Sequence, residues 1–260
     1  LYSASGGLAT ARRLLTSGLC FFELMEEVLE QPITHWIAPG ADHYLVHRDS
    51  VVSADQMQAY MLAVAELVDA HPDRDRYPDK PRRVDFRRIP LSAAPTATGS
   101  PITACMRVPE RSVATQPLAD ALTGRAYEQP GLEIRTGTVV RAAELDGPRA
   151  AVLTDQGRLA GFDYVVNALW HGRPLVDQAS VGYCDPEPHH RYRMSLFLEG
   201  GPELEFPNAV IAAGPFGDVK NYGGGHGYLS WYPAGLMAEK AGIPPPTLAL
   251  PSGPEKQRTS

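Results

Sequence analysis

Three stretches of the chain repeat hydrophobic residues at the spacing of an α-helix. Residues 8–29 carry them along one face, which predicts an amphipathic helix. A second helix is expected to open at Ser53, because Ser53 and Gln56 have the spacing of a capping box, and to end at His71-Pro72. The third is expected over residues 115–127. In the second helix, Met57 and Met61 lie on the apolar stripe and are expected in the core.

From Leu132 onward the pattern changes to that of β-strands separated by polar turns. Turns are expected at Asp146-Gly147 and at residues 155–157. The predicted strands cover residues 132–145, 149–154 and 162–169, and later 191–198, 208–213 and 227–232.

Two further stretches are expected to be connections. Residues 73–84 are charged and interrupted by proline, which indicates a solvated loop. Residues 223–227 read Gly-Gly-Gly-His-Gly and precede a strand, not a helix, so we interpret them as a hairpin turn and not as a phosphate-binding loop.

The strand predicted over residues 162–169 has the most informative pattern. Tyr164, Val165 and Val166 suit a strand that is covered on both faces, and small or amide residues follow at Asn167 and Ala168. Open α/β sheets bind ligands at the carboxyl ends of their strands. The residues alone fit a ligand-side strand end and an ordinary core strand equally well.

Composition favours a globular protein that acts on a small molecule. The 260 residues carry a net charge of -6, which argues against a general nucleic-acid or anionic-membrane binder. Cys20, Cys105 and Cys184 have no metal-ligand spacing, so we expect no metal site and reduced thiols in a cytoplasmic protein. The run of apolar residues from Leu19 to Leu29 is broken by three glutamates and is not expected to span a membrane.

The two ends of the sequence are unusual. The chain starts at Leu1 and enters a helix almost at once, so we expect that residues precede it in the complete protein. Residues 236–260 contain Pro244-Pro245-Pro246 and a polar, proline-containing end, and we expect a disordered tail.

The order of these segments resembles the FAD-dependent oxidoreductases of the D-amino-acid oxidase type, in an uncharacterised bacterial branch. In these proteins a helix leads to a strand beside the adenine, then a β-meander, then a strand that ends in a small-residue turn near the cofactor. The corresponding segments are 131–140 and 162–170. The resemblance also includes residues 46–50, 108–113, 214–222 and 228–235, and it covers roughly residues 1 to 235.

The resemblance implies a set of residues that contact FAD. The backbone at Val139 or Val140 would meet the adenine, and the turn Asn167-Ala168-Leu169 would approach the phosphates or ribose. Trp170 would stack on a cofactor edge, although a tryptophan that fills a corner of the core is an equally good interpretation. His171, beside this turn, is a candidate proton relay.

One defining motif of that family does not occur in the sequence. A Gly-x-Gly-x-x-Gly turn normally opens the helix that binds the pyrophosphate, and no such run is present. The sequence therefore resembles the interior of a family member, and an alternative is a non-catalytic remnant that folds but does not bind FAD.

Because a flavin accepts the hydride itself, the protein need only bind the cofactor, orient the donor and exclude water. A small amine or amino-acid-like donor would use Arg48 for a carboxylate and tyrosines beside it, of which Tyr222 and Tyr228 are the main candidates. Lys220, Asn221 and Tyr232 are further candidates, with solubility of a strand edge as the alternative for Lys220 and Asn221.

Two histidine-containing runs have weaker interpretations. His47 and Asp49 flank Arg48 and would handle a proton or form a surface salt-bridge cluster, which is the interpretation we favour for Asp49. His189 and His190 are expected in solvent. A Ser-His-Asp hydrolase is not favoured, because the sequence has no Gly-x-Ser-x-Gly elbow.

The fold class expected is α/β, of mixed α+β type. A partial Rossmann-like FAD-binding domain, residues 1–35 and 113–175, is interleaved with an α+β substrate domain, residues 36–112 and 176–235, that contains a mainly antiparallel sheet. No oligomeric state follows from the sequence.

Overall fold

The computed structural model describes residues 7–181, 188–201, 203 and 205–247. The chain forms two compact units, and each is described by itself. Unit 1 contains Leu1–Glu133 and Ser195–Gly235, and unit 2 contains Ile134–Met194 and Leu236–Ser260. Residues 1–35, expected in the FAD-binding domain, fall in the same unit as residues 36–133, most of which were expected in the substrate domain. The division is by packing, and it does not assign either unit to a cofactor or a substrate.

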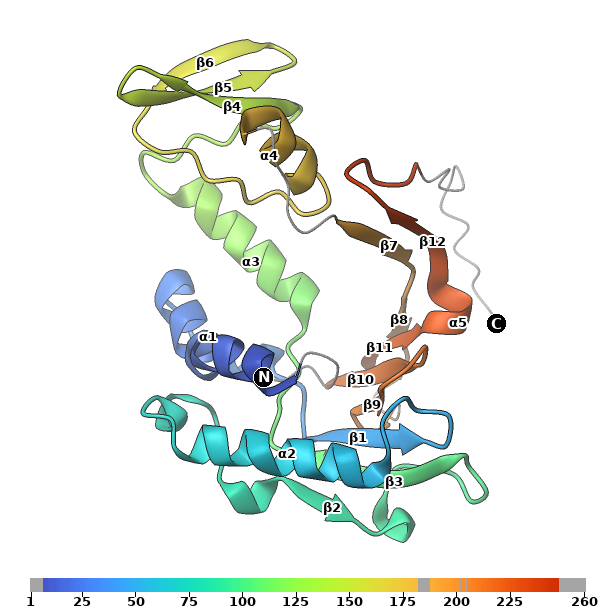
Figure 1. The fold of residues 1–260 in the computed structure, drawn as a ribbon. Coiled ribbons are helices and arrows are strands. Elements are labelled where there is room, and N and C mark those ends of the chain that lie inside the picture. The colour runs from blue at the N-terminus through green and yellow to red at the C-terminus, as the bar shows by residue number, and fades with distance from the viewer. Residues whose placement is uncertain (1–6, 182–187, 202, 204, 248–260) are drawn as a thin grey trace. The chain divides into compact units, whose positions relative to one another are not determined.

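Unit 1 is built on a seven-stranded mixed sheet with the order β2-β3-β1-β9-β10-β11-β8 (Figure 1). β1 pairs with β3 in antiparallel and with β9 in parallel orientation, and the remaining pairs in the sheet are antiparallel. The strands are β1 (Asp42–His47), β2 (Arg87–Ile89), β3 (Ile102–Val108), β8 (Leu196–Glu199), β9 (Ala209–Ala212), β10 (Gly217–Gly223) and β11 (His226–Trp231).

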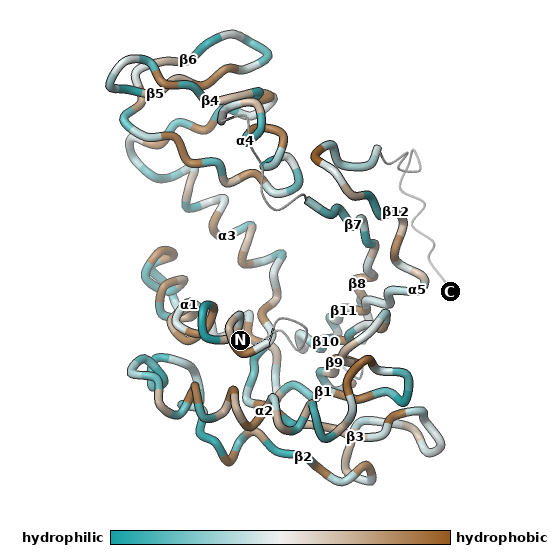
Figure 2. The backbone as a smooth tube through the Cα atoms, viewed as in Figure 1, coloured by the Kyte–Doolittle hydropathy of each residue, from teal (hydrophilic) through white to brown (hydrophobic). Residues whose placement is uncertain are grey.

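Helices cover one face of this sheet at β1 and β3. α1 (Gly7–Leu29) and α2 (Ala54–Asp69) pack on each other, and α3 (Thr115–Glu128) packs on α1. Hydrophobic and hydrophilic residues alternate along α1 and α2 (Figure 2), as an amphipathic helix requires. Short helical turns complete the unit at Thr34–Trp36, Arg74–Arg76, Arg83–Asp85, Leu91–Ala93 and Tyr232–Gly235 (α5).

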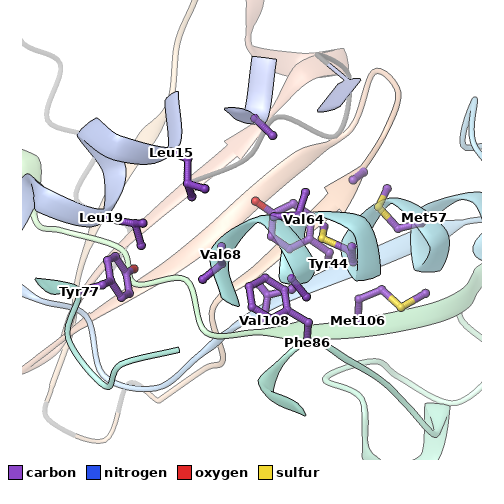
Figure 3. Close-up of a cluster of buried hydrophobic side chains, with 14 of the residues drawn as sticks. Leu15, Leu19, Tyr44, Met57, Val64, Val68, Tyr77, Phe86, Met106 and Val108 are labelled. Atoms are coloured by element: carbon purple, nitrogen blue, oxygen red, sulfur yellow. The ribbon is translucent and has the colours of Figure 1, made fainter. Parts of the chain in front are cut away.

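The core of unit 1 contains the apolar faces predicted for the first two helices. Leu15 and Leu19 of α1 are buried, as are Met57 and Met61 of α2, which confirms the core assignment of both methionines. Side chains from β1 and β3 meet them from the sheet (Figure 3). The Ser53 hydroxyl accepts a hydrogen bond from the Gln56 backbone N–H, and the Gln56 side chain accepts one from the Ser53 backbone N–H. The predicted capping box is therefore confirmed.

Unit 2 contains two small antiparallel sheets and one helix. β4 (Val140–Asp146), β5 (Arg149–Thr154) and β6 (Gly157–Phe162) form a meander, and the turns predicted between these strands are confirmed. α4 (Arg173–Val181) packs on β4. A separate two-stranded sheet pairs β7 (His189–Arg193) with β12 (Leu236–Ala241).

Two strand predictions in unit 2 were wrong in extent. The first was expected from residue 132 but begins at Val140, since Gly137 has a left-handed backbone (φ 65) that interrupts an extended run. Residues 164–169 form no ladder, and Tyr164 and Val166 are exposed. The β-branched and aromatic pattern there is typical of a covered strand, but the described residues contain no strand that pairs with this segment.

Three other expectations need correction. Residues 191–198 are two strands, β7 and β8, because the chain passes from unit 2 to unit 1 at Met194–Ser195. Residues 236–241 form β12, so the disordered tail was wrong there; residues 248–260 lie outside the described part of the chain. Residues 73–84 are a loop as predicted, yet Tyr77 is buried in the core.

Within the described part of the chain, no helix is both long enough and apolar enough to cross a membrane. 

A glycine in β10 fixes the spacing of the hairpin that it forms with β11. A Cβ added at Gly217 would lie 1.7 Å from the carbonyl oxygen of Ser230, which is backbone and cannot rotate away. The two strands therefore approach more closely here than any side chain permits.

We expect Gly217→Ala to lower the free energy of unfolding by about 3 kcal/mol, the upper range of overpacking costs. The control is Gly124→Ala in α3, where an added Cβ has nothing within 4 Å, and where alanine should stabilise the helix by about 0.8 kcal/mol. Urea unfolding followed by circular dichroism measures both, and equal stabilities for the two variants would contradict the close approach.

Candidate functional site

A buried amide network joins β10 to the segments that precede β1 and β9 in the unit 1 sheet. The Asn208 side chain accepts a hydrogen bond from the Asn221 backbone N–H (2.7 Å) and donates one to the Pro39 carbonyl (2.9 Å). The Asn221 side chain in turn donates to the Phe206 carbonyl (2.9 Å) and accepts from the Gly223 N–H (2.8 Å). The backbone on both sides of Tyr222 is thereby held in place.

A buried ion pair lies beside this network. The Lys220 ammonium is 2.5 Å from the Asp42 carboxylate, and their side chains are 12% and 3% exposed. Burial raises the pKa of Asp42 above its ordinary value of 3.8, while the charge of Lys220 and its hydrogen bond oppose that shift. The expectation that Lys220 serves a strand edge in solvent was wrong, because β10 is an interior strand.

Two tyrosines of the neighbouring core are held by similar contacts. The Tyr44 hydroxyl donates to the Glu110 carboxylate at 2.6 Å, and burial together with the charge of Glu110 raises the pKa of Tyr44 well above 10.0. The Tyr77 hydroxyl accepts a hydrogen bond from the Arg111 N–H. Both phenols therefore stay neutral at physiological pH and act as fixed supports.

An aromatic cavity of about 640 Å³ opens at this end of the sheet. Its walls come from the turn at Thr34–Trp36, the start of α3, and the neighbouring strands β10, β11 and β8, all in unit 1. The aromatic and polar side chains that line it are His35, Trp36, Thr115, Gln116, Phe197, Glu199, Tyr222 and His226.

Strand pairing aligns the side chains on the sheet side of the aromatic cavity. Phe197 lies opposite Tyr228, and Glu199 lies opposite His226, so all four project from the same face of β8 and β11. The Phe197 and Tyr228 rings meet edge to face with centroids 5.6 Å apart. On the other wall, the Ala114 N–H donates to the Trp36 carbonyl at 2.8 Å, which ties the turn to the start of α3.

The two predicted catalytic tyrosines lie close together. Tyr222 is half-buried and lines the aromatic cavity, and burial, followed by the influence of Tyr228 and Asp218, raises its pKa above 10.0. The Tyr228 hydroxyl is 2.9 Å from the Ser195 hydroxyl. The Tyr222 side chain is therefore a neutral hydrogen-bonding group on the cavity wall.

The third predicted catalytic residue, Arg48, lies elsewhere. It follows the carboxyl end of β1, while Lys220 and Tyr222 lie at the amino end; the five steps along this six-residue strand, at about 3.3 Å each, put these ends roughly 17 Å apart. Its side chain is 72% exposed and 3.9 Å from Asp49, which is also 3.5 Å from His47. The surface ion-pair interpretation is confirmed for Arg48 and Asp49, whereas the His47 Nδ1 accepts a hydrogen bond from the Asp49 backbone N–H at 3.0 Å. Arg48 is not brought to the two tyrosines.

Unit 2 has a cavity of its own, which we call the meander cavity, of about 740 Å³. It lies where the start of β4 meets the turn after residue 168 and the helix α4. Three of the residues predicted to bind a cofactor, Val139, Val140 and Leu169, line it together with Thr138, Arg141, Gly172, Leu175, Val176, Gln178 and Ala179. The wall is mainly aliphatic.

Backbone groups at Val139 are already used. The Val139 N–H donates to the Asp155 carboxylate, and the Val139 carbonyl accepts from the Asp155 N–H, both at 3.0 Å. Val139 can therefore offer its side chain to a ligand, but not the free backbone edge that the sequence suggested.

The other residues predicted to bind a cofactor, Asn167, Ala168 and Trp170, do not line the meander cavity. The Asn167 amide donates to the Arg173 carbonyl (3.1 Å) and to Asp177 (2.8 Å), so it closes the loop on α4, and Ala168 is exposed. Trp170 is 93% exposed, which makes the interpretation as a core corner wrong. It lines a different cavity of unit 2 with His171, whose ring centroid is 6.1 Å from that of Tyr192.

His190 also departs from expectation. It is buried, and its Nε2 lies 3.1 Å from the Ile243 carbonyl, because β12 covers β7 on one side. His189 is exposed as predicted and lies 3.0 Å from Glu239.

Several residues of the aromatic cavity were not singled out from the sequence. Phe197 and Glu199 alternate along β8 as His226 and Tyr228 alternate along β11, and this paired alternation was the available signal. Trp36 gave no such signal, because it lies in an irregular turn whose partner, Ala114, is far along the chain.

Solved structures of oxidases share this fold. Glycine oxidase from Geobacillus kaustophilus superposes with a TM-score of 0.61 at 14% identity, over 93% of this chain and 58% of that chain. L-proline dehydrogenase from P. horikoshii has a TM-score of 0.56 at 14% identity, over 87% of this chain and 55% of that chain. Iminodiacetate oxidase from Chelativorans sp. BNC1 has a TM-score of 0.55 at 13% identity, over 93% of this chain and 58% of that chain. The chain thus spans less than two thirds of these proteins, and the similarity shows the mixed α/β fold.

No family model matches the sequence, and no curated protein matches it significantly.

The Asp42–Lys220 pair makes a specific prediction for stability. Lys220→Met leaves a buried carboxylate without its counter-charge and should lower the free energy of unfolding by about 3 kcal/mol at neutral pH. The double variant Asp42→Asn with Lys220→Met should regain most of that loss, since it removes both charges.

The pH dependence has a defined sign. Without Lys220, burial raises the pKa of Asp42 further, so the carboxyl group takes up a proton on acidification and the loss shrinks as the pH falls below neutral. Urea unfolding at several pH values measures this. A deficit that is independent of pH, or a double variant as unstable as the single one, would contradict the ion pair.

Proposed function

We propose that the protein is a FAD-dependent oxidoreductase that takes a hydride from a small amine or amino-acid-like donor. The observation that carries the proposal is the fold, which is shared with proteins named as oxidases or dehydrogenases of glycine, L-proline and iminodiacetate. The segment order that resembles the D-amino-acid oxidase type is an independent reason from the sequence. When bound, FAD supplies the hydride acceptor.

The meander cavity is the candidate site for the adenine end of the cofactor. Its walls are aliphatic, as in most cofactor pockets, and Val140 and Leu169 approach it from two segments that the sequence had already linked to FAD. Asn167 would act indirectly, by holding the turn against α4 through Asp177.

The residues present do not fit the whole cofactor. The sequence has no Gly-x-Gly-x-x-Gly run for the pyrophosphate, and Gly223–Gly225 form the turn between β10 and β11, with no helix behind it. No catalytic step is therefore assigned through the flavin. The alternative that this missing motif favours is a chain that folds without binding FAD.

The aromatic cavity of unit 1 is the candidate site for the donor. Tyr222 would offer a neutral hydroxyl, and the Trp36 and Phe197 rings would pack against the bound molecule. Tyr228 would orient Phe197 through their edge-to-face contact. Arg48 is not proposed as part of this site.

FAD titration of the purified chain tests the cofactor proposal. We expect bound flavin, seen as quenched flavin fluorescence, and we expect Leu169→Arg to weaken binding by at least about tenfold because a charged side chain enters the meander cavity (~1.4 kcal/mol). The control, Leu145→Arg, places the same change on an exposed residue of β4 and should leave binding unaltered.

Equal weakening in both leucine variants would remove the meander cavity from the proposal. A wild-type chain that is folded by circular dichroism and binds no FAD would favour the non-catalytic alternative.

A further inference from the structure

We propose that the aromatic cavity of unit 1 binds an organic ammonium ion that carries no carboxylate. Taken with the proposed function, on which this second step rests, the donor is then a simple amine and not an amino acid. The binding itself does not depend on a flavin.

Ring faces and edges supply the first part of the argument. Trp36, Phe197 and Tyr222 line the cavity from three different segments, and the His35 and Trp36 rings lie with centroids 4.4 Å apart. Aromatic rings attract a cation through their quadrupole, most strongly where water is excluded. They offer no comparable attraction to a carboxylate.

Charge supplies the second part. The described residues that line the cavity include a carboxylate, Glu199, and neither lysine nor arginine. Glu199 has no ion pair with any residue that the structure describes. It stands directly opposite His226 across β8 and β11, at the edge of the cavity, where an ammonium group on a bound molecule can reach it.

A lysine on the strand beside β11 is already paired with a carboxylate. Lys220 is on the neighbouring strand, but its ammonium is 2.5 Å from Asp42 and almost fully buried. Arg48 is at the other end of β1. A donor carboxylate in this cavity would therefore be desolvated without a full positive charge to compensate it.

One feature works in the opposite direction. The start of α3 lines the cavity, and the N-cap residue that precedes it, Ala114, provides no side-chain cap. A helix start carries about half a positive charge, spread over its free N–H groups. This partial positive charge is smaller than the full negative charge of Glu199. It would stabilise a hydroxyl or carbonyl oxygen on the same ligand.

Three ligands that share a phenethyl skeleton test which of these interactions determines binding. Phenethylamine carries the ammonium group, phenethyl alcohol replaces it by a neutral hydroxyl, and phenylalanine adds a carboxylate to the amine. We expect phenethylamine to bind at least about tenfold more tightly than either of the others, the ratio that ~1.4 kcal/mol of cation recognition produces. Isothermal titration calorimetry on the chain without FAD measures all three.

Two variants assign the effect to named groups. Glu199→Gln keeps the shape and removes the charge, and we expect it to weaken phenethylamine about fivefold while leaving phenethyl alcohol unchanged. Phe197→Leu should weaken phenethylamine about threefold through the lost ring. The matched control is Glu128→Gln, an exposed glutamate at the end of α3 outside the cavity, which should have no effect.

Phenylalanine binding as tightly as phenethylamine, or more tightly, would overturn the proposal and assign the cavity to amino acids through the start of α3. Equal binding of the amine and the alcohol would overturn it in favour of a purely apolar site, and no binding of any of the three would overturn it outright. FAD titration of the same chain is independent, so loss of flavin binding with amine binding retained would count against the proposed function only.

Discussion

The contact between Asp42 and Lys220 determines how the two halves of the unit 1 sheet come together. Asp42 opens β1, Lys220 lies in β10, and β9 runs between them, so one ion pair fixes strands separated by 178 positions in the sequence. Asn208, directly before β9, reinforces the same junction by bonding to β10 and to the loop before β1. The aromatic cavity lies beside this junction because Tyr222 follows Lys220 by two residues.

Local patterns were enough to predict the elements whose stability is local. Ser53 and Gln56 cap α2 wherever the helix packs, and the turn after Asp146 needs only its own glycine. Residues 164–169 show the limit, because their pattern specifies burial without specifying a partner. The change of sheet between Met194 and Ser195 was equally hidden, since strand periodicity carries no information on which sheet a strand joins.

The candidate site was predicted in part for a similar reason. Tyr222 and Tyr228 lie close together because one hairpin holds both of them, and Val139, Val140 and Leu169, which the family pattern had linked, line one cavity; their roles stay predictions. Arg48 was grouped with these tyrosines by residue type, and the direction of β1 places it at the other end of that strand. Trp36 was missed, because its place in the cavity depends on a turn that joins residues 78 positions apart.

The position of β8 has a consequence for how a molecule enters the aromatic cavity. Among the described strands β8 is the last in its sheet and pairs only with β11, so it can separate after losing a single ladder of hydrogen bonds, whereas β10 is held on both sides. Local opening costs least at such an edge. Phe197 and Glu199 therefore lie on the strand of the cavity wall that is paired on one side only, whereas the strand that carries Tyr222 is paired on both sides.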